Sequence, residues 1–148
     1  MSQTITIHRV FSAPPERVFR AFTDPEAMIK WMPPHGFTAK VHYIDVRVGA
    51  GYKISFTNFT TGFSHSFTGT YVEIIPNKLI RYTDRFDDPD ISESIFVTVH
   101  FNPVMVGTEL NLTLTGIPNE IPAEACYLGW QESLNLLGLL VNPEIPDV

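Results

Sequence analysis

The stretch that most constrains the fold is a helical pattern near the C-terminus, residues 122–141, with the sequence PAEACYLGWQESLNLLGLLV. At 100° per residue its apolar side chains fall on one broad stripe, and the opposite side is mostly polar. The stripe consists of Ala123, Cys126, Trp130, Leu134, Leu137, Leu140 and Val141. Pro122 suits a first helical turn, and Pro143 prevents the helix from continuing. Such a helix needs a surface to pack on, and the preceding segments read as strands that supply it.

The segments before this helix follow a different period. A first strand is expected at 4–11, followed by two short helices, the first capped by Ser12 and the second beginning near Pro25. About six strands are expected between residues 37 and 115, because apolar and polar residues alternate there between Gly, Pro and Asn turns. Strands so close in sequence pair antiparallel. The sequence predicts an α+β fold, one domain over 1–148, with a curved antiparallel sheet of six to seven strands wrapped around the long helix.

Strand 63–75 has two faces of different character. One face carries Phe63, His65, Phe67 and Tyr71, and the other carries mainly hydroxyl and aliphatic side chains. A bulge near Gly69 would allow both faces to contribute to the interior. The aromatic face is the one expected to point inward.

The charge balance excludes several classes of partner. Ten Lys and Arg face sixteen Asp and Glu, for a net charge of −6. Nucleic acids and anionic membrane surfaces require a basic patch, so neither is expected as a partner. No run of eighteen apolar residues predicts membrane insertion, and no apolar leader is visible, so a cytoplasmic location is expected. The single cysteine, Cys126, is expected to be a small buried hydrophobic residue.

No metal or cofactor pattern is visible in the sequence. The five histidines are scattered without metal-ligand spacing, and no phosphate-binding loop or nucleophile motif occurs. The acidic loop at 87–90 lacks the glycine and terminal glutamate of a calcium loop. Glu73 and Arg81 are expected to form an exposed cross-strand pair. We therefore expect no cofactor and no metal site.

The aromatic residues are the most suggestive functional feature. They are expected to converge on the concave side of the sheet, with Trp130 facing Phe56 and Phe101 and with Trp31 and His35 at the entrance. Gly129 is expected to let the helix approach the sheet closely. Ordinary core packing is the alternative for each of these residues. The predicted ligand contacts are Trp31, His35, Phe37, Tyr52, Phe56, Phe67, Tyr82, Phe101, Trp130, Leu134 and Leu137.

Several short stretches resemble a known family. They are APPERV at 13–18, FTDPE at 22–26, KWMP at 30–33, DVRVG at 45–49, GTYVEI at 69–74, Pro76, GT at 107–108 and GW at 129–130. Together they resemble the START-like, or SRPBCC, helix-grip superfamily, and within it the bacterial stand-alone form of the family named after the activator of heat-shock-protein-90 ATPase. Ala50 departs from this pattern, since the family often has a second glycine there. The resemblance implies a hydrophobic ligand cavity and brings no shared catalytic set.

Three functions are compatible with these observations. The first is a binding module for a small hydrophobic or aromatic molecule. The second is an enzyme of the same superfamily, of the cyclase, hydratase or hydrolase type, which would need converging polar groups, for instance His35 with Tyr52 or Tyr82. The third is a chaperone-ATPase activator, against which we note that the family's co-chaperones carry a further N-terminal domain. Leu128 and Leu139 project from the polar side of the long helix and suggest a weak homodimer.

Overall fold

The computed structural model describes residues 3–91 and 93–148. In this part of the chain, seven strands form one antiparallel sheet in the order β1-β7-β6-β5-β4-β3-β2. The predicted α+β architecture is therefore confirmed. The elements are β1 (Gln3–Phe11), α1 (Pro15–Thr23), α2 (Pro25–Trp31), β2 (Phe37–Ile44), β3 (Gly51–Asn58), β4 (Ser64–Ile75), β5 (Leu79–Phe86), β6 (Ile95–Val104), β7 (Gly107–Ile117) and α3 (Ala123–Val141).

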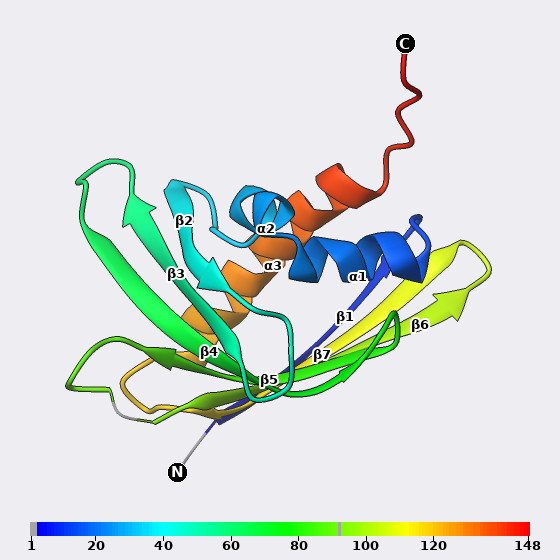
Figure 1. Ribbon diagram of the computed structural model, residues 1–148. Helices are drawn as coiled ribbons and strands as arrows, with labels where there is room; N and C mark the ends of the chain where they lie inside the picture. The colour runs from blue at the N-terminus through cyan, green and yellow to red at the C-terminus, as the bar shows by residue number, and fades with distance from the viewer. Residues whose placement is uncertain (1–2, 92) are drawn as a thin grey trace.

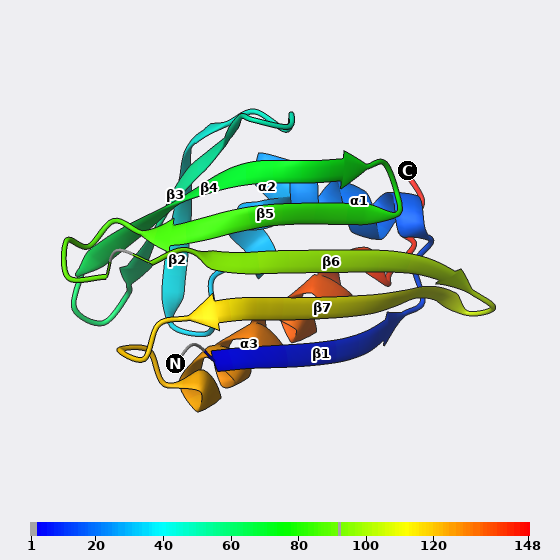
Figure 2. The same ribbon diagram turned by 90° about the horizontal axis from the view of Figure 1, so that it is seen from below.

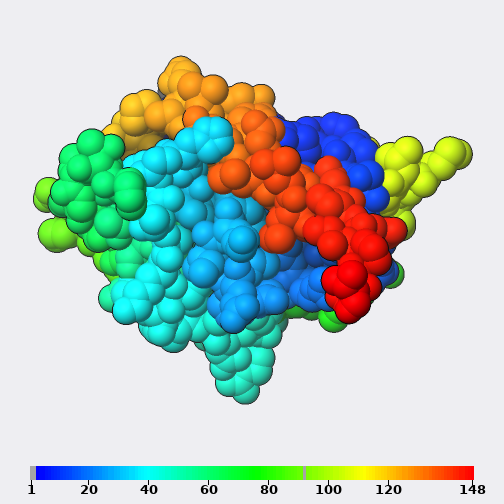
Figure 3. Space-filling view, turned by 90° about the horizontal axis from the view of Figure 1, so that it is seen from above, coloured from blue at the N-terminus to red at the C-terminus, as the bar shows by residue number. Residues whose placement is uncertain are grey.

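The sheet curves, and all three helices lie on its concave face (Figure 1). Seen from below in Figure 2, β1, β7, β6, β5 and β4 run side by side, and β2 and β3 turn up behind them. Helix α3 packs on the edge strand β1 and on α1 and α2. In the space-filling view of Figure 3, the C-terminal part of α3 lies beside α1 and α2. The sheet thus wraps around a helix that sits toward one edge, on β1, and this placement positions the site.

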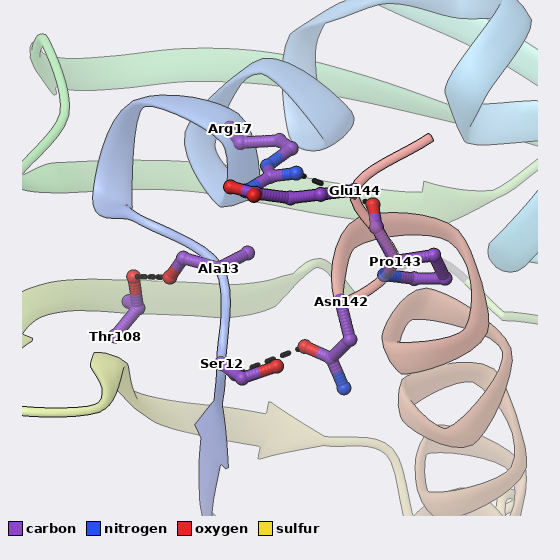
Figure 4. Close-up of polar contacts among 7 residues, drawn as sticks. All are labelled: Ser12, Ala13, Arg17, Thr108, Asn142, Pro143 and Glu144. Carbon is purple, nitrogen blue, oxygen red and sulfur yellow. Dashed lines mark hydrogen bonds and ion pairs between the residues drawn. The ribbon is translucent and has the colours of Figure 1, made fainter. Parts of the chain in front are cut away.

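The junction between β1 and α1 differs from the prediction that Ser12 caps the first helix. The residue at the N-cap position is Pro14, and no side chain caps the helix. The Ser12 backbone N–H instead donates to Asn142 Oδ1, just after α3, at 3.0 Å (Figure 4). Beside it, the buried Thr108 hydroxyl donates to the Ala13 carbonyl oxygen at 2.7 Å. The start of α1 is therefore held by tertiary contacts, which local sequence cannot reveal.

Strand β4 turns its aromatic face inward. Phe67 and Tyr71 are buried, whereas Phe63 lies before the strand and is 70% exposed. The register of β4 against β5 shifts between Tyr71 and Glu73, a bulge a few residues beyond the position predicted at Gly69. After this bulge Ile74 packs against the core. Both faces of the strand thus contribute to the interior, each on its own side of the bulge.

Two surface predictions concern exposed residues. Glu73 and Arg81 form the expected cross-strand pair, with Arg81 Nη1 3.1 Å from Glu73 Oε1. Leu128 and Leu139 are 62% and 74% exposed on α3. The weak homodimer that they suggest stays a prediction, and light scattering that gives a monomer at high protein concentration would contradict it. Among the described residues, no helix is both long and apolar enough to span a bilayer.

Candidate functional site

A cavity of about 320 Å³ lies between the first half of α3 and the concave face of strands β2 to β7. This volume is within the range of small-molecule sites, about 300–1,000 Å³. The wall is mainly aromatic and aliphatic. It consists of Trp31, Met32, Pro34, Phe37, Phe56, His65, Phe67, Tyr82, Asp84, Phe86, Ile95, Leu114, Ile121, Ala125, Cys126, Gly129, Trp130 and Ser133.

The structure brings six of the predicted site residues together around this cavity. They come from six different elements, and they include both tryptophans, whose ring centroids lie 6.4 Å apart. On the sheet, Phe56 and Phe67 meet edge to face at 4.7 Å between ring centroids. The six residues are Trp31, Phe37, Phe56, Phe67, Tyr82 and Trp130.

Three other predicted residues lie in packed core away from the cavity. Phe101 is 1% exposed, and its ring lies 5.2 Å from Phe22, so it supports the α1 side of the core and does not face Trp130. Leu134 and Leu137 are fully buried in the later part of α3. The apolar stripe of the helix is continuous, but only its first half faces open volume. Periodicity identifies the inward side of a helix and does not show what lies opposite.

The entrance differs from the one predicted. Trp31 is fully buried, and its Nε1–H donates to the Ala21 carbonyl oxygen at 2.8 Å, so this residue is a fixed wall of the cavity. The His35 side chain is 63% exposed and lies outside the cavity wall. Its backbone N–H donates to Glu132 Oε1 at 3.1 Å. His35 therefore does not converge with Tyr52 or Tyr82, which was one arrangement that the enzyme alternative could have used.

Gly129 does not serve the close helix–sheet contact that the sequence suggested. A Cβ placed at this position would meet no atom within 4 Å, so the glycine adds space to the cavity. One turn later, Ser133 is buried in the same helix face, and its hydroxyl donates to the carbonyl oxygens of Met32 and Gly129. This serine fastens α3 to the segment after α2, which contributes Pro34 to the wall. Cys126, expected to be buried, is only partly so and also lines the cavity.

Asp84 is the one carboxylate among the wall residues that sequence analysis missed. It lies on β5 between Tyr82 and Phe86, and all three side chains line the cavity. Alternate residues of a β-strand point to the same face of the sheet, so an inward Tyr82 already indicated an inward Asp84. Its Oδ1 accepts a hydrogen bond from the Tyr52 hydroxyl at 3.0 Å. Tyr52, predicted as a direct ligand contact, lies behind the wall and holds this carboxyl instead.

A glycine makes this hydrogen bond possible. Gly69 on β4 pairs with Tyr52 on β3 and with Asp84 on β5, so the three residues form one row across the sheet. A Cβ on Gly69 would lie 2.2 Å from the Tyr52 ring. The missing side chain therefore lets the Tyr52 ring cross β4 and reach Asp84. This close approach is the physical role of Gly69.

Burial dominates the electrostatics of the site. It raises the pKa of Asp84 to about 7, although the hydrogen bond from Tyr52 opposes this shift. Burial, together with the charge of Asp84, also raises the pKa values of Tyr52 and Tyr82, so both phenols stay neutral. The pKa of His65 is lowered because its ring is partly buried. Within the described residues, no three His, Cys, Asp or Glu residues are placed to hold a metal ion.

Comparison with known proteins agrees with this architecture. Residues 12–142 match the family described as Activator of Hsp90 ATPase homolog 1-like protein. The chain belongs to this family. The START-like helix-grip fold predicted from the sequence is thereby confirmed for this member of the Hsp90-ATPase-activator homologue family. No curated protein matches the chain.

Solved structures of similar proteins share the fold over nearly their whole length. A protein from Chromobacterium violaceum is 51% identical, with a TM-score of 0.93 and coverage of 95% of this chain and 98% of that one. A protein from Rhizobium leguminosarum is 26% identical, with a TM-score of 0.81 and 97% coverage of both chains. A third, from Rhizobium loti, is 27% identical, with a TM-score of 0.79 and coverage of 94% and 96%. Membership in the Hsp90-ATPase-activator homologue family is thus accompanied by a well-preserved helix-grip architecture.

Proposed function

We propose that this protein binds a small hydrophobic or aromatic molecule between α3 and the sheet. The observation that carries the proposal is the cavity of about 320 Å³ with aromatic walls and one carboxyl group at Asp84. Protein interiors are packed about as densely as organic crystals, and voids larger than a water molecule are few. A volume of this size is therefore more than a packing defect. A mainly apolar wall with a few polar groups is the usual composition of a ligand site.

The cavity offers enough apolar surface for useful affinity. A ligand that buries about 200 Å² of apolar surface would gain roughly 5 kcal/mol at about 25 cal/mol per Å². Rigid walls reduce the entropy lost on binding, and several walls here are held in place. The Trp31 indole is fixed by its hydrogen bond to Ala21, and α3 is fastened by Ser133. Micromolar to millimolar affinity is the expected range for such a ligand.

Gly129 allows a sharp test of this proposal. Because a side chain at this position enters open volume, Gly129→Leu should fill part of the cavity without disturbing the fold. Gly129→Ala is the matched control, since it adds one carbon and the same gain in helix propensity, about 1 kcal/mol. The probe is 2-(1-naphthyl)ethanol, titrated calorimetrically into each variant. Gly129→Leu should weaken binding by about tenfold or more, and Gly129→Ala should retain it. Equal affinity in all three proteins would overturn the proposal.

The Asp84–Tyr52 pair is the specific observation that favours an enzyme as the second candidate. A carboxyl with a pKa of about 7 is suited to donate or accept a proton near neutral pH. The tyrosine holds that carboxyl in place through a 3.0 Å hydrogen bond. Mass spectrometry of a bound ligand after prolonged incubation tests this candidate. A product that forms with the wild-type protein and not with Asp84→Asn would support an enzyme. A ligand that stays chemically unchanged would leave ligand binding as the function.

A further inference from the structure

We infer that the ligand carries a positively charged amino group and that Asp84 is the residue that pairs with it. This inference rests on the proposed function, because it assigns the ligand class of the same cavity. Three features support it: an unused hydrogen-bond acceptor on the carboxyl, the lack of a counter-ion among the described residues, and the aromatic walls around it.

The Asp84 carboxyl has one oxygen engaged and one oxygen available. Oδ1 accepts from the Tyr52 hydroxyl at 3.0 Å. Among the hydrogen bonds of residues 3–91 and 93–148, none involves Asp84 Oδ2, yet no polar side-chain atom in this part of the chain is buried without a partner. Oδ2 must therefore be accessible, and the surface that Asp84 presents is the cavity wall. This oxygen offers a hydrogen-bond acceptor to whatever occupies the cavity.

No described side chain around Asp84 supplies a positive charge at neutral pH. The titratable groups near it come from β3, β4, β5, the loop after β5 and α3, and they are Tyr52, His65, Tyr71, Tyr82, Asp87 and Cys126. His65 is the one member of this set that can become cationic, and burial lowers its pKa. Ile95 and Leu114, which β6 and β7 contribute to the wall, are apolar.

The nearby basic residues do not pair with Asp84. Arg85, the next residue on β5, is exposed and is absent from the cavity wall. Lys53 lies 3.7 Å from Asp87, and the Arg81 guanidinium pairs with Glu73 and lies over the Phe96 ring, 5.1 Å from its centroid. A carboxylate taken out of bulk water without a counter-ion is costly. An ammonium group on the ligand would supply the missing partner in a charge-assisted hydrogen bond.

The walls of the cavity select for the same chemistry. Phe67, Phe86 and Trp130 present aromatic rings, which attract cations through the negative potential of their faces. A carboxylate ligand would meet the negative charge of Asp84 in the cavity wall. The ligand class that fits is an amine attached to a one- or two-ring hydrocarbon body. Anionic molecules of the same shape are excluded.

Three probes of one shape test this inference by calorimetry at pH 8. They are 2-(1-naphthyl)ethylamine, 2-(1-naphthyl)ethanol and 1-naphthylacetate, which place a cation, a neutral group and an anion at the same position. In the wild-type protein, the amine should bind about ten- to hundredfold tighter than the alcohol, and the acetate should bind more weakly than both. Asp84→Asn should abolish the preference for the amine while keeping the affinity for the alcohol. Glu124→Gln, which removes an exposed carboxylate at the start of α3, is the matched control and should change nothing.

The pH dependence supplies a second measurement that needs no variant. Because the amine pairs with the ionised carboxyl, its affinity should fall about tenfold for each pH unit below 7, whereas the affinity for the alcohol should stay constant. The amino group of the probe stays protonated over this range, as that of lysine does. An alcohol that binds the wild-type protein as tightly as the amine, or an amine affinity without this pH dependence, would overturn the inference alone. Failure of both the amine and the alcohol to bind would overturn the proposed function with it.

Discussion

The two tryptophans of the cavity wall provide a matched pair for testing whether the volume beside α3 is open. Trp31 is fully buried, its indole N–H donates to Ala21, and its ring lies 4.6 Å from that of Phe22. Trp130 is partly exposed and lines the cavity, and among the described residues its indole N–H has no protein partner. Both substitutions remove the same atoms, so any difference between them reports on the surroundings.

The structure predicts different losses of stability for the two. Trp31→Ala leaves an indole-sized void in packed core, which costs about 3–5 kcal/mol, and it leaves the Ala21 carbonyl without its partner, for about 1–3 kcal/mol more. Trp130 buries roughly two-thirds of an indole's ~200 Å², so Trp130→Ala should cost about 3 kcal/mol at ~25 cal/mol per Å². The additional cost of creating a void is small at Trp130, because the adjacent volume is already open.

Urea unfolding followed by far-ultraviolet circular dichroism measures both losses. Because the loss at Trp31 approaches the total stability of a typical domain, about 5–15 kcal/mol, Trp31→Phe is the companion variant that should still fold. It keeps the ring and loses the hydrogen bond, for about 1–3 kcal/mol. A free energy of unfolding that falls by 4 kcal/mol or more in Trp130→Ala would refute the reasoning, because Trp130 would then be core and not a cavity wall.

Two further predictions concern the row of residues that holds the carboxyl. The pKa of Asp84 is about 7 in the folded protein and near 4 in the unfolded chain, so the unfolded chain releases this proton first as the pH rises. The contribution of Asp84 to stability is therefore complete below pH 4 and is lost between pH 4 and 7, by up to about 4 kcal/mol. Over this window, urea titrations should show that the free energy of unfolding of the wild type falls relative to that of Asp84→Asn. A difference between the two proteins that does not change with pH would contradict the assignment. Gly69→Ala should displace the Tyr52 ring, cost about 1–3 kcal/mol and raise the pKa of Asp84 further, because the hydrogen bond that lowers it is lost. Carbon-13 NMR titration of the carboxyl checks this, and an unchanged pKa would argue against the role of the glycine.

The fold could be predicted from local sequence patterns, whereas the site could be predicted only in part. The alternation in β7 puts Leu110, Leu112 and Leu114 on one face, and all three are buried as this pattern indicates. In α3, periodicity identified the inward side, yet Leu134 meets packed core whereas Trp130 meets open volume. What lies opposite a helix face depends on how the sheet curves and on which edge the helix occupies. Neither property is encoded in the period of the helix.

The polar residues of the interior were the hardest to predict. Asp84 and Ser133 interrupt apolar patterns, and a polar residue in such a place is read as exposed unless its partner is known. Here the partners are distant in sequence: Tyr52 reaches Asp84 across Gly69, and Ser133 reaches the Met32 carbonyl oxygen. A glycine in a strand was a signal that another side chain crosses there, although the sequence does not reveal which one.

The central claim is that the space between α3 and the sheet is a ligand site organised by Asp84. The most direct measurement is a crystal structure of the protein grown with 2-(1-naphthyl)ethylamine. We expect a naphthyl ring enclosed between Trp130 and Phe67, with the amino nitrogen about 2.7–2.9 Å from an Asp84 carboxyl oxygen. A cavity closed by its own side chains, or a probe bound only on the outer surface, would contradict it.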